Sequence, residues 1–141
     1  MTPILPPREV FDRLIDGVAG KGWDELLALY APDAVVRHPF GPPDGPVLRG
    51  REALREHFAA AAALPLEMRA EDRVVHETAD PEVVIGEFTY RGQFTDTGRA
   101  FAVRNIFVLR VRDGQIVESR DYADHVAFAA ARAALSSDHI G

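Results

Sequence analysis

The stretch GQIVESRDYAD, from Gly114 to Asp124, has the residue order of a strand with one acidic side chain on its apolar side. Successive side chains of a strand point to opposite faces, so one face carries Val117, Ser119, Asp121 and Ala123. The other face carries a mostly solvated set: Ile116, Glu118, Arg120, Tyr122 and Asp124. The pattern therefore predicts that Asp121 points inward among small and apolar neighbours.

A carboxylate in that position is expected to be partly desolvated. Burying a charge is costly unless something compensates, so we expect a raised proton affinity for Asp121 and a role in moving protons. An alternative is open at this point: Asp121 pairs with an inward Arg or a backbone donor and only holds the sheet together.

This strand is the last of four that the sequence predicts. From Leu66 onward the apolar residues recur with a period of two, over residues 66–77, 82–94, 99–112 and 115–124. The connections are Ala79-Asp80-Pro81, Asp96-Thr97-Gly98 and Asp113-Gly114, and the last two have hairpin turn chemistry. Consecutive hairpins predict an antiparallel meander.

The N-terminal half has helical periodicity instead. It predicts a first helix that starts after Pro6 and Pro7, a second over Trp23–Tyr30 that Pro32 ends, and a third over residues 51–63. A short strand, 34–38, and a Pro/Gly-rich loop, 39–46, precede the third helix. A last, Ala-rich helix over about residues 126–135 could cover a sheet edge or reach a partner subunit.

Helices gathered before a meander predict an α+β fold with the helices packed on one face of the sheet. With 141 residues, of which 47% are hydrophobic, the chain suits one compact domain over residues 1–141. The net charge of -6 and the lack of any basic run argue against nucleic acid as a partner.

Several classes of site are not expected. The chain has no Cys, its five His residues do not match metal-ligand spacing, and no nucleotide-binding motif occurs, so we expect no metal and no cofactor. The N-terminus does not resemble a secretion signal, and the longest apolar run, 58–66, is too short to cross a bilayer. We expect a cytoplasmic protein that does not enter the membrane.

The inward faces predict a cavity with aromatic walls and a few polar groups that could orient a ligand. The catalytic candidates are Asp121 and His57. The candidates for substrate binding are Trp23, Tyr30, His38, Phe88, Tyr90, Asn105 and Phe107. Blander interpretations stay open, since a lone His on an apolar helix face is often a core residue and Asn105 could only cap a bulge. The opposite sheet face, with Ile106, Val108 and Ile116 among charges, predicts a homodimer interface.

The order of these features resembles a known superfamily. Three helices, a Pro-rich loop after a short strand, Gly50-Arg51-Glu52 at the start of the third helix and the closing DGQIVESRDYAD are similar to nuclear transport factor 2-like proteins. Within them, the chain resembles the SnoaL-like proteins related to ketosteroid isomerase and polyketide cyclases. The resemblance implies a cone-shaped α+β barrel, a bent antiparallel sheet wrapped by three N-terminal helices around a deep pocket, and usually a dimer.

The resemblance also bears on individual residues. Asp121 coincides with the acid or base of SnoaL-like cyclases and limonene epoxide hydrolases. Epoxide hydrolysis is not implied, because Phe88 and Tyr90 stand where those hydrolases need an Arg and a second Asp. In the phenazine-biosynthesis branch a third-helix His works with a carboxylate on the last strand, and His57 and Asp121 match those places, although the acid there is Glu.

The sequence thus predicts a small-molecule enzyme that performs cofactor-independent proton transfer on a hydrophobic, polyketide-like metabolite, by isomerisation, aldol-type cyclisation or dehydration. The alternative is a non-catalytic protein that binds a small apolar ligand in the same pocket. The substrate, the hydrogen-bond partner of Asp121 and any lid function of residues 40–47 stay open.

Overall fold

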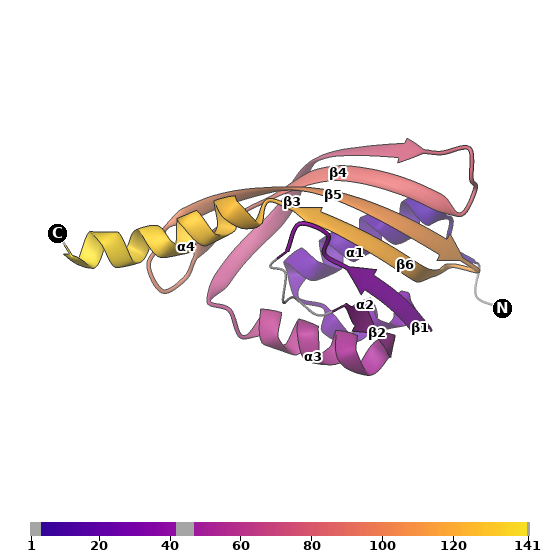
Figure 1. Cartoon of the computed structure of the whole chain (residues 1–141), viewed down its shortest axis with the longest axis horizontal. Helices are drawn as coiled ribbons and strands as arrows, with labels where there is room; N and C mark the ends of the chain where they lie inside the picture. The colour runs from indigo at the N-terminus through magenta and orange to yellow at the C-terminus, as the bar shows by residue number, and fades with distance from the viewer. Residues whose placement is uncertain (1–3, 42–46, 141) are drawn as a thin grey trace.

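A computed structural model describes residues 4–41 and 47–140, in which one bent sheet carries helices on its concave side (Figure 1). The six strands have the order β2-β1-β6-β5-β4-β3, and the sheet is open and not closed into a barrel. The strands are β1 (Tyr30–Arg37), β2 (Leu48–Arg49), β3 (Leu66–Glu77), β4 (Val83–Phe94), β5 (Ala100–Arg112) and β6 (Gln115–Ala123). The predicted α+β class is confirmed.

The predicted meander is confirmed, with each of its strands within one residue of the expected bounds. β3, β4, β5 and β6 pair antiparallel in sequence order. Alternating burial along β5 places Phe101, Val103, Asn105 and Phe107 on the concave face. Because directly paired residues share a face, the pairing of Phe107 with Asp121 sets Asp121 on that face too.

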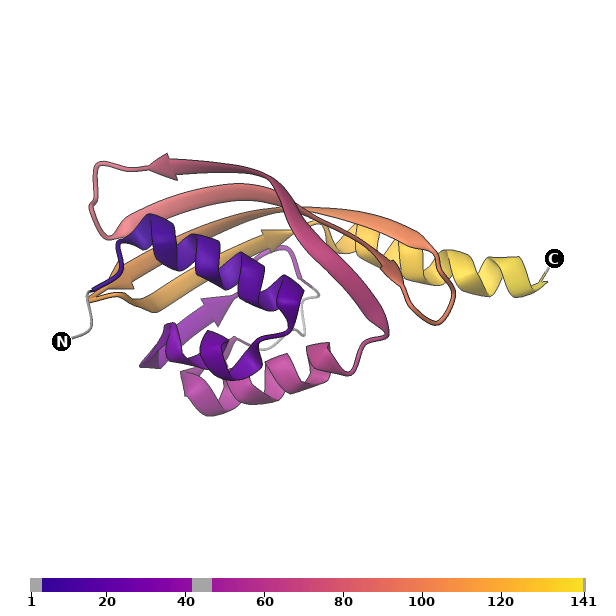
Figure 2. The same cartoon turned by 180° about the vertical axis from the view of Figure 1, so that it is seen from behind.

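Three helices, α1 (Pro7–Gly20), α2 (Trp23–Ala28) and α3 (Gly50–Ala62), lie on the concave side of the sheet (Figure 2). The apolar stripe of α1 is fully buried through Val10, Phe11, Leu14 and Ile15. Phe11 packs where β4 has no side chain: a Cβ at Gly86 would lie 2.1 Å from Phe11 Cζ. Glycine at this position therefore lets α1 approach the sheet closely.

The boundary between the second helix and the first strand was predicted wrongly. The helix ends at Ala28, and β1 begins at Tyr30, four residues earlier than the periodicity indicated. The backbone N–H of Ile116 donates to Leu29 O, and β1 then pairs parallel with β6. This sheet pairing recruits Tyr30, which helical spacing alone had assigned to the helix.

The position of Ile116 also differs from the prediction. Ile116 is fully buried in the main hydrophobic cluster, whereas strict alternation placed it on the solvated face. The pairing of β5 with β6 shifts between Arg110 and Val111, which shows a β-bulge beside Val117. Because of the extra residue, Ile116 points to the face opposite to the predicted one. Ser119 and Asp121, which follow the bulge, point to the predicted face.

The last helix, α4 (His125–Ile140), is longer than predicted and extends beyond the sheet (Figure 1). Its start is capped by Asp124 Oδ1, which accepts from the N–H of Ala127 at 2.9 Å. Phe128 packs on Phe94 and Phe101, and Arg132 pairs with Asp96 at 3.1 Å. The first half of α4 thus covers the β4–β5 hairpin end.

Among the described residues, no helix is long and apolar enough to cross a membrane.

Candidate functional site

A cavity of about 310 Å³ lies between the concave face of the sheet and the helices. It is lined by eight of the nine candidate residues: Trp23, Tyr30, His38, His57, Tyr90, Asn105, Phe107 and Asp121. The ninth, Phe88, does not line it and is buried in the core, where its ring contacts Phe11, Tyr90 and Phe107. Phe88 therefore supports the wall from behind.

Aromatic side chains form a large part of the wall. Trp23 stacks on Phe58 with ring centroids 5.5 Å apart, and Tyr30 contacts the same ring at 6.0 Å. Phe101 and Phe128 close the part of the cavity beside the β4–β5 hairpin. Phe58, Phe101 and Phe128 were not among the sequence candidates. Phe101 shares the two-residue period of Asn105 and Phe107, and this signal could have found it.

Asp121 is the buried acidic group of this cavity, which the exposed Asp124 also lines. Its side chain is 13% exposed, and burial raises its pKa from 3.8 to about 7. The hydroxyl of Ser119, which is fully buried, donates to Asp121 Oδ1 and partly opposes that rise in pKa. Within the described part of the chain, the basic neighbour of Asp121 is His38, which is charged only when it is protonated. The alternative of an inward Arg partner is therefore not what the structure has.

Three histidines, His38, His57 and His125, line the cavity that contains this carboxyl group. His38 Nε2 lies 3.8 Å from Asp121 Oδ2, and the rings of His38 and His57 are 5.6 Å apart. Burial lowers the pKa of His57 and, together with the neighbouring His57 and His125, lowers the pKa of His38. His125 was missed by the sequence analysis, yet it continues the inward series Ser119, Asp121, Ala123 by two more residues. Across residues 4–41 and 47–140, no three His, Cys, Asp or Glu side chains converge to hold a metal ion.

Two polar groups in the cavity wall are buried without a hydrogen-bond partner among the described residues: Tyr90 Oη and His125 Nε2. Burial, reinforced by the nearby Asp121, keeps the pKa of Tyr90 well above its usual value, so its hydroxyl retains its proton. Asn105 uses one amide N–H to donate to Val103 O at 2.9 Å. An unpartnered buried donor such as Tyr90 is available to a ligand oxygen.

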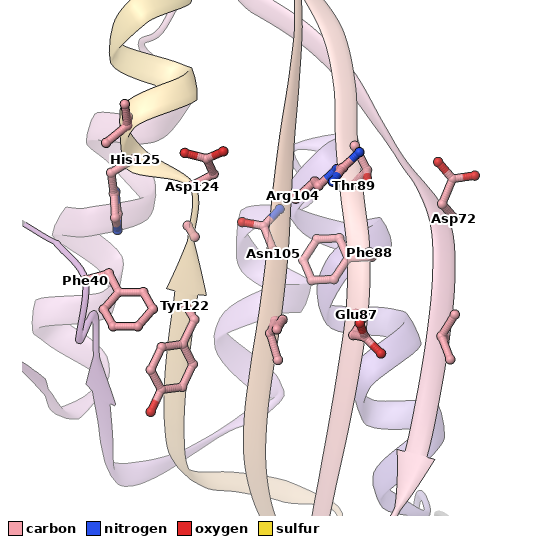
Figure 3. A pocket seen from close by; sticks show the side chains of 14 residues that line it. Phe40, Asp72, Glu87, Phe88, Thr89, Arg104, Asn105, Tyr122, Asp124 and His125 are labelled. Atoms are coloured by element: carbon pink, nitrogen blue, oxygen red, sulfur yellow. The ribbon is translucent and has the colours of Figure 1, made fainter.

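A second hollow, of about 570 Å³, lies on the other face of the sheet (Figure 3). Charged residues line it, including Asp72, Glu87 and Arg104, beside the exposed Val74 and Ile106. Phe40 packs edge-on against Tyr122, with ring centroids 5.1 Å apart. Asn105, Ala123, Asp124 and His125 line both this hollow and the cavity that contains Asp121, and Phe88 lines the hollow only.

Comparisons with known proteins agree with this geometry. Residues 11–119 match the family model of the SnoaL-like domain. An uncharacterized PhzA/B-like protein of Pseudomonas aeruginosa is 37% identical over 111 residues, which are 78% of this chain and 76% of that protein. A steroid Delta-isomerase of Nocardioides simplex is 33% identical over 114 residues, 78% of this chain and 83% of the isomerase.

A solved structure from Bacillus subtilis, described as an isomerase candidate, has a TM-score of 0.78 at 25% identity and covers 87% of this chain and 92% of its own. The match of the family model spans well over half of the chain, and the similar structures share its helix-covered bent sheet. The chain therefore belongs to the SnoaL-like family.

Proposed function

We propose that the protein catalyses cofactor-independent proton transfer next to a carbonyl group of a hydrophobic metabolite, with Asp121 as the general base. The observation that carries this proposal is a carboxyl group whose pKa burial raises to about 7, inside an aromatic cavity. A group with a pKa near the working pH takes up and returns protons with equal ease, which is the property that general acid–base catalysis needs.

The mechanism begins with removal of a proton from the carbon beside the carbonyl by Asp121. The electron pair of that C–H bond moves onto the carbonyl oxygen, which becomes an enolate. The unpartnered Tyr90 hydroxyl is the donor we assign to that oxygen, with His57 and Asn105 as further donors. A buried donor stabilises the developing charge strongly because water is excluded. Return of the proton to another carbon gives isomerisation, whereas attack by the enolate carbon gives cyclisation.

The size and lining of the cavity favour a compact apolar substrate. Its volume of about 310 Å³ is at the lower end of the range for ligand pockets. The polar groups of Asp121, His38 and His57 share the cavity with aromatic and aliphatic side chains. The similarity to a steroid Delta-isomerase agrees with a fused-ring or polyketide-like ketone as the substrate class.

The test is deuterium exchange, which detects the proton-transfer step itself, whatever product follows from it. A panel of hydrophobic ketones is incubated with the protein in D₂O, and deuterium incorporation is followed by mass spectrometry. For a ketone that exchanges, Asp121→Asn should slow the reaction by about 10²- to 10⁴-fold. Glu118→Gln, on the other side of the same strand, is the matched control and should leave the rate unchanged. Undiminished exchange in Asp121→Asn would remove Asp121 from the mechanism.

A second candidate is a binding protein without chemistry. The buried and unpartnered Tyr90 Oη and His125 Nε2 favour it, since both could bind a polar ligand group with no reaction. A ketone that raises the melting temperature, yet is recovered without deuterium after long incubation, would support binding over catalysis.

We also propose that two copies associate through the outer sheet face. Val74 and Ile106 are exposed there beside Phe40 and Tyr122, and this patch includes part of the face that the sequence assigned to an interface. Light scattering at micromolar concentration should give the mass of a dimer, and Ile106→Lys should give the mass of a monomer. A monomeric wild-type protein would contradict this assembly.

A further inference from the structure

The two oxygens of Asp121 have different surroundings. Oδ1 accepts the hydrogen bond from the Ser119 hydroxyl, which leaves Oδ2 directed to His38 Nε2 at 3.8 Å. That separation is too long for a direct hydrogen bond. It is short enough for one water molecule or one substrate oxygen to lie about 2.8 Å from both atoms.

His38 is held in this place by the backbone around it. It follows β1, whose last residue Arg37 pairs with Arg120 of β6, and its carbonyl accepts from the N–H of Gly41 at 2.9 Å. Its side chain is 25% exposed and lines the cavity. The ring of His57 contacts the rings of His38 and Phe58. The imidazole that lies next to the Asp121 carboxyl group is that of His38.

The groups that face His38 come from several elements. They are Asp121 from β6, His57 from α3 and His125 from α4, while Tyr30 from β1 and Tyr90 from β4 lie near Asp121. His57 and His125 oppose the protonation of His38, and burial opposes the ionisation of Asp121. His38 therefore holds a proton less tightly than usual and Asp121 holds one more tightly than usual, so the two groups compete for a single proton.

We infer that Asp121 and His38 act together as a pair that holds one proton between them, with His38 as the general acid opposite the base Asp121. The inference rests on the proposed function. Asp121 carboxylate takes the proton from the substrate carbon while the His38 imidazolium gives its Nε2 proton to the carbonyl oxygen, which forms a neutral enol. In the second half, Asp121 returns its proton to carbon, and His38 recovers the enol proton. Both groups end in their starting states.

The pH dependence of kcat/KM tests this assignment. With an ionised Asp121 and a protonated His38 both required, the wild-type profile should be bell-shaped. His38→Gln should lower kcat about 10²-fold and abolish the fall at alkaline pH, because the acid is lost. His57→Gln should keep both limbs of the profile, and His76→Gln, on the outer face of β3, is the control that should not change the rate. If the rate of His38→Gln still falls at alkaline pH, the inference is overturned. His38→Asn is measured as a second variant, in case His38→Gln does not fold.

A second measurement needs no substrate. Proton–nitrogen NMR of the wild-type protein should show the His38 ring titrating in two steps, because two interacting groups share their macroscopic pKa values. In Asp121→Asn the ring should titrate in one step. A single step in both proteins overturns the pairing whatever the enzymatic result. A two-step titration together with undiminished exchange in Asp121→Asn keeps the pairing and removes only the proposed function.

Discussion

The same chemical group has opposite properties in two regions of this protein. In the cavity, burial raises the pKa of Asp121 to about 7. At the β3–β4 turn, the backbone N–H of Glu82 and the side chain of Arg110 lower the pKa of Asp80. Hydrogen bonds from Arg112 and Arg110 lower the pKa of Glu82 in the same cluster.

The difference lies in what surrounds each carboxylate. The turn cluster is open to solvent and supplies a cation for each acid, so ionisation is favoured and the groups stay charged. Asp121 has one hydroxyl donor and a His that resists protonation. Charged pairs on the surface thus indicate a structural role. A buried carboxyl group without a permanent cation indicates a site that can change its protonation state.

The largest expected effect on stability comes from replacing Asp121 by Asn. The folded-state pKa of Asp121 is raised from 3.8 to about 7, so its contribution to stability is intact below pH 4 and is lost as the pH rises toward 7. Asp121→Asn should therefore match the wild type near pH 4 and exceed it at pH 8 by up to roughly 4 kcal/mol in the free energy of unfolding. Urea denaturation at both pH values measures the difference, and equal stability at pH 8 would be evidence for a hydrated carboxyl.

The next effect separates stability from function at Tyr90. Its buried hydroxyl has no partner among the described residues, so Tyr90→Phe should raise the free energy of unfolding by about 1–3 kcal/mol while slowing exchange or weakening ligand binding. Tyr122→Phe, on the outer face, is the matched control and should change stability by less than about 0.5 kcal/mol. A destabilised Tyr90→Phe protein would mean that the hydroxyl is satisfied in solution.

A smaller effect is expected from Ser119→Ala. The hydroxyl donates to Asp121 and lowers its pKa, so removing it should raise that pKa further. The rise of kcat/KM with pH should then move to higher pH, with the rate at alkaline pH little changed. If kcat/KM of Ser119→Ala rises at the same pH as that of the wild type, the hydrogen bond from Ser119 does not act on the ionised carboxyl group.

The smallest effect is expected at the turn. Glu82→Gln removes the negative charge that pairs with Arg110 and Arg112. The lowered pKa of Glu82 means that its charged form stabilises the fold at neutral pH. The melting temperature should fall slightly in about 10 mM salt and not measurably in about 1 M salt, where exposed charges are screened. A large drop that salt does not reduce would show that Glu82 supports the fold by packing.

The sequence predicted the features that depend on local periodicity. The two-residue period gave the four strands of the meander and the facing of Asp121, and helical spacing gave the inward side of His57. It failed where tertiary pairing overrides a local pattern. Pairing with β6 draws Tyr30 into a strand, and a bulge turns Ile116 inward, neither of which a period can reveal.

The candidate site shows the same limit. Alternation identifies which residues face the concave side, but not which of them reach the cavity. Phe88 and Tyr90 share one face of β4, yet only Tyr90 lines the cavity because the rings of Phe11 and Phe107 cover Phe88. The contact between His38 and Asp121 depends on the parallel pairing of β1 with β6, which the sequence did not predict.

The central claim is that the Asp121 carboxyl group is desolvated inside the cavity and titrates near neutral pH. Carbon NMR of its side-chain carboxyl, followed from pH 3 to 9 and assigned by comparison with Asp121→Asn, tests this without any ligand. A principal transition is expected near pH 7. A single transition near pH 3.8, the usual value for aspartate, would contradict it.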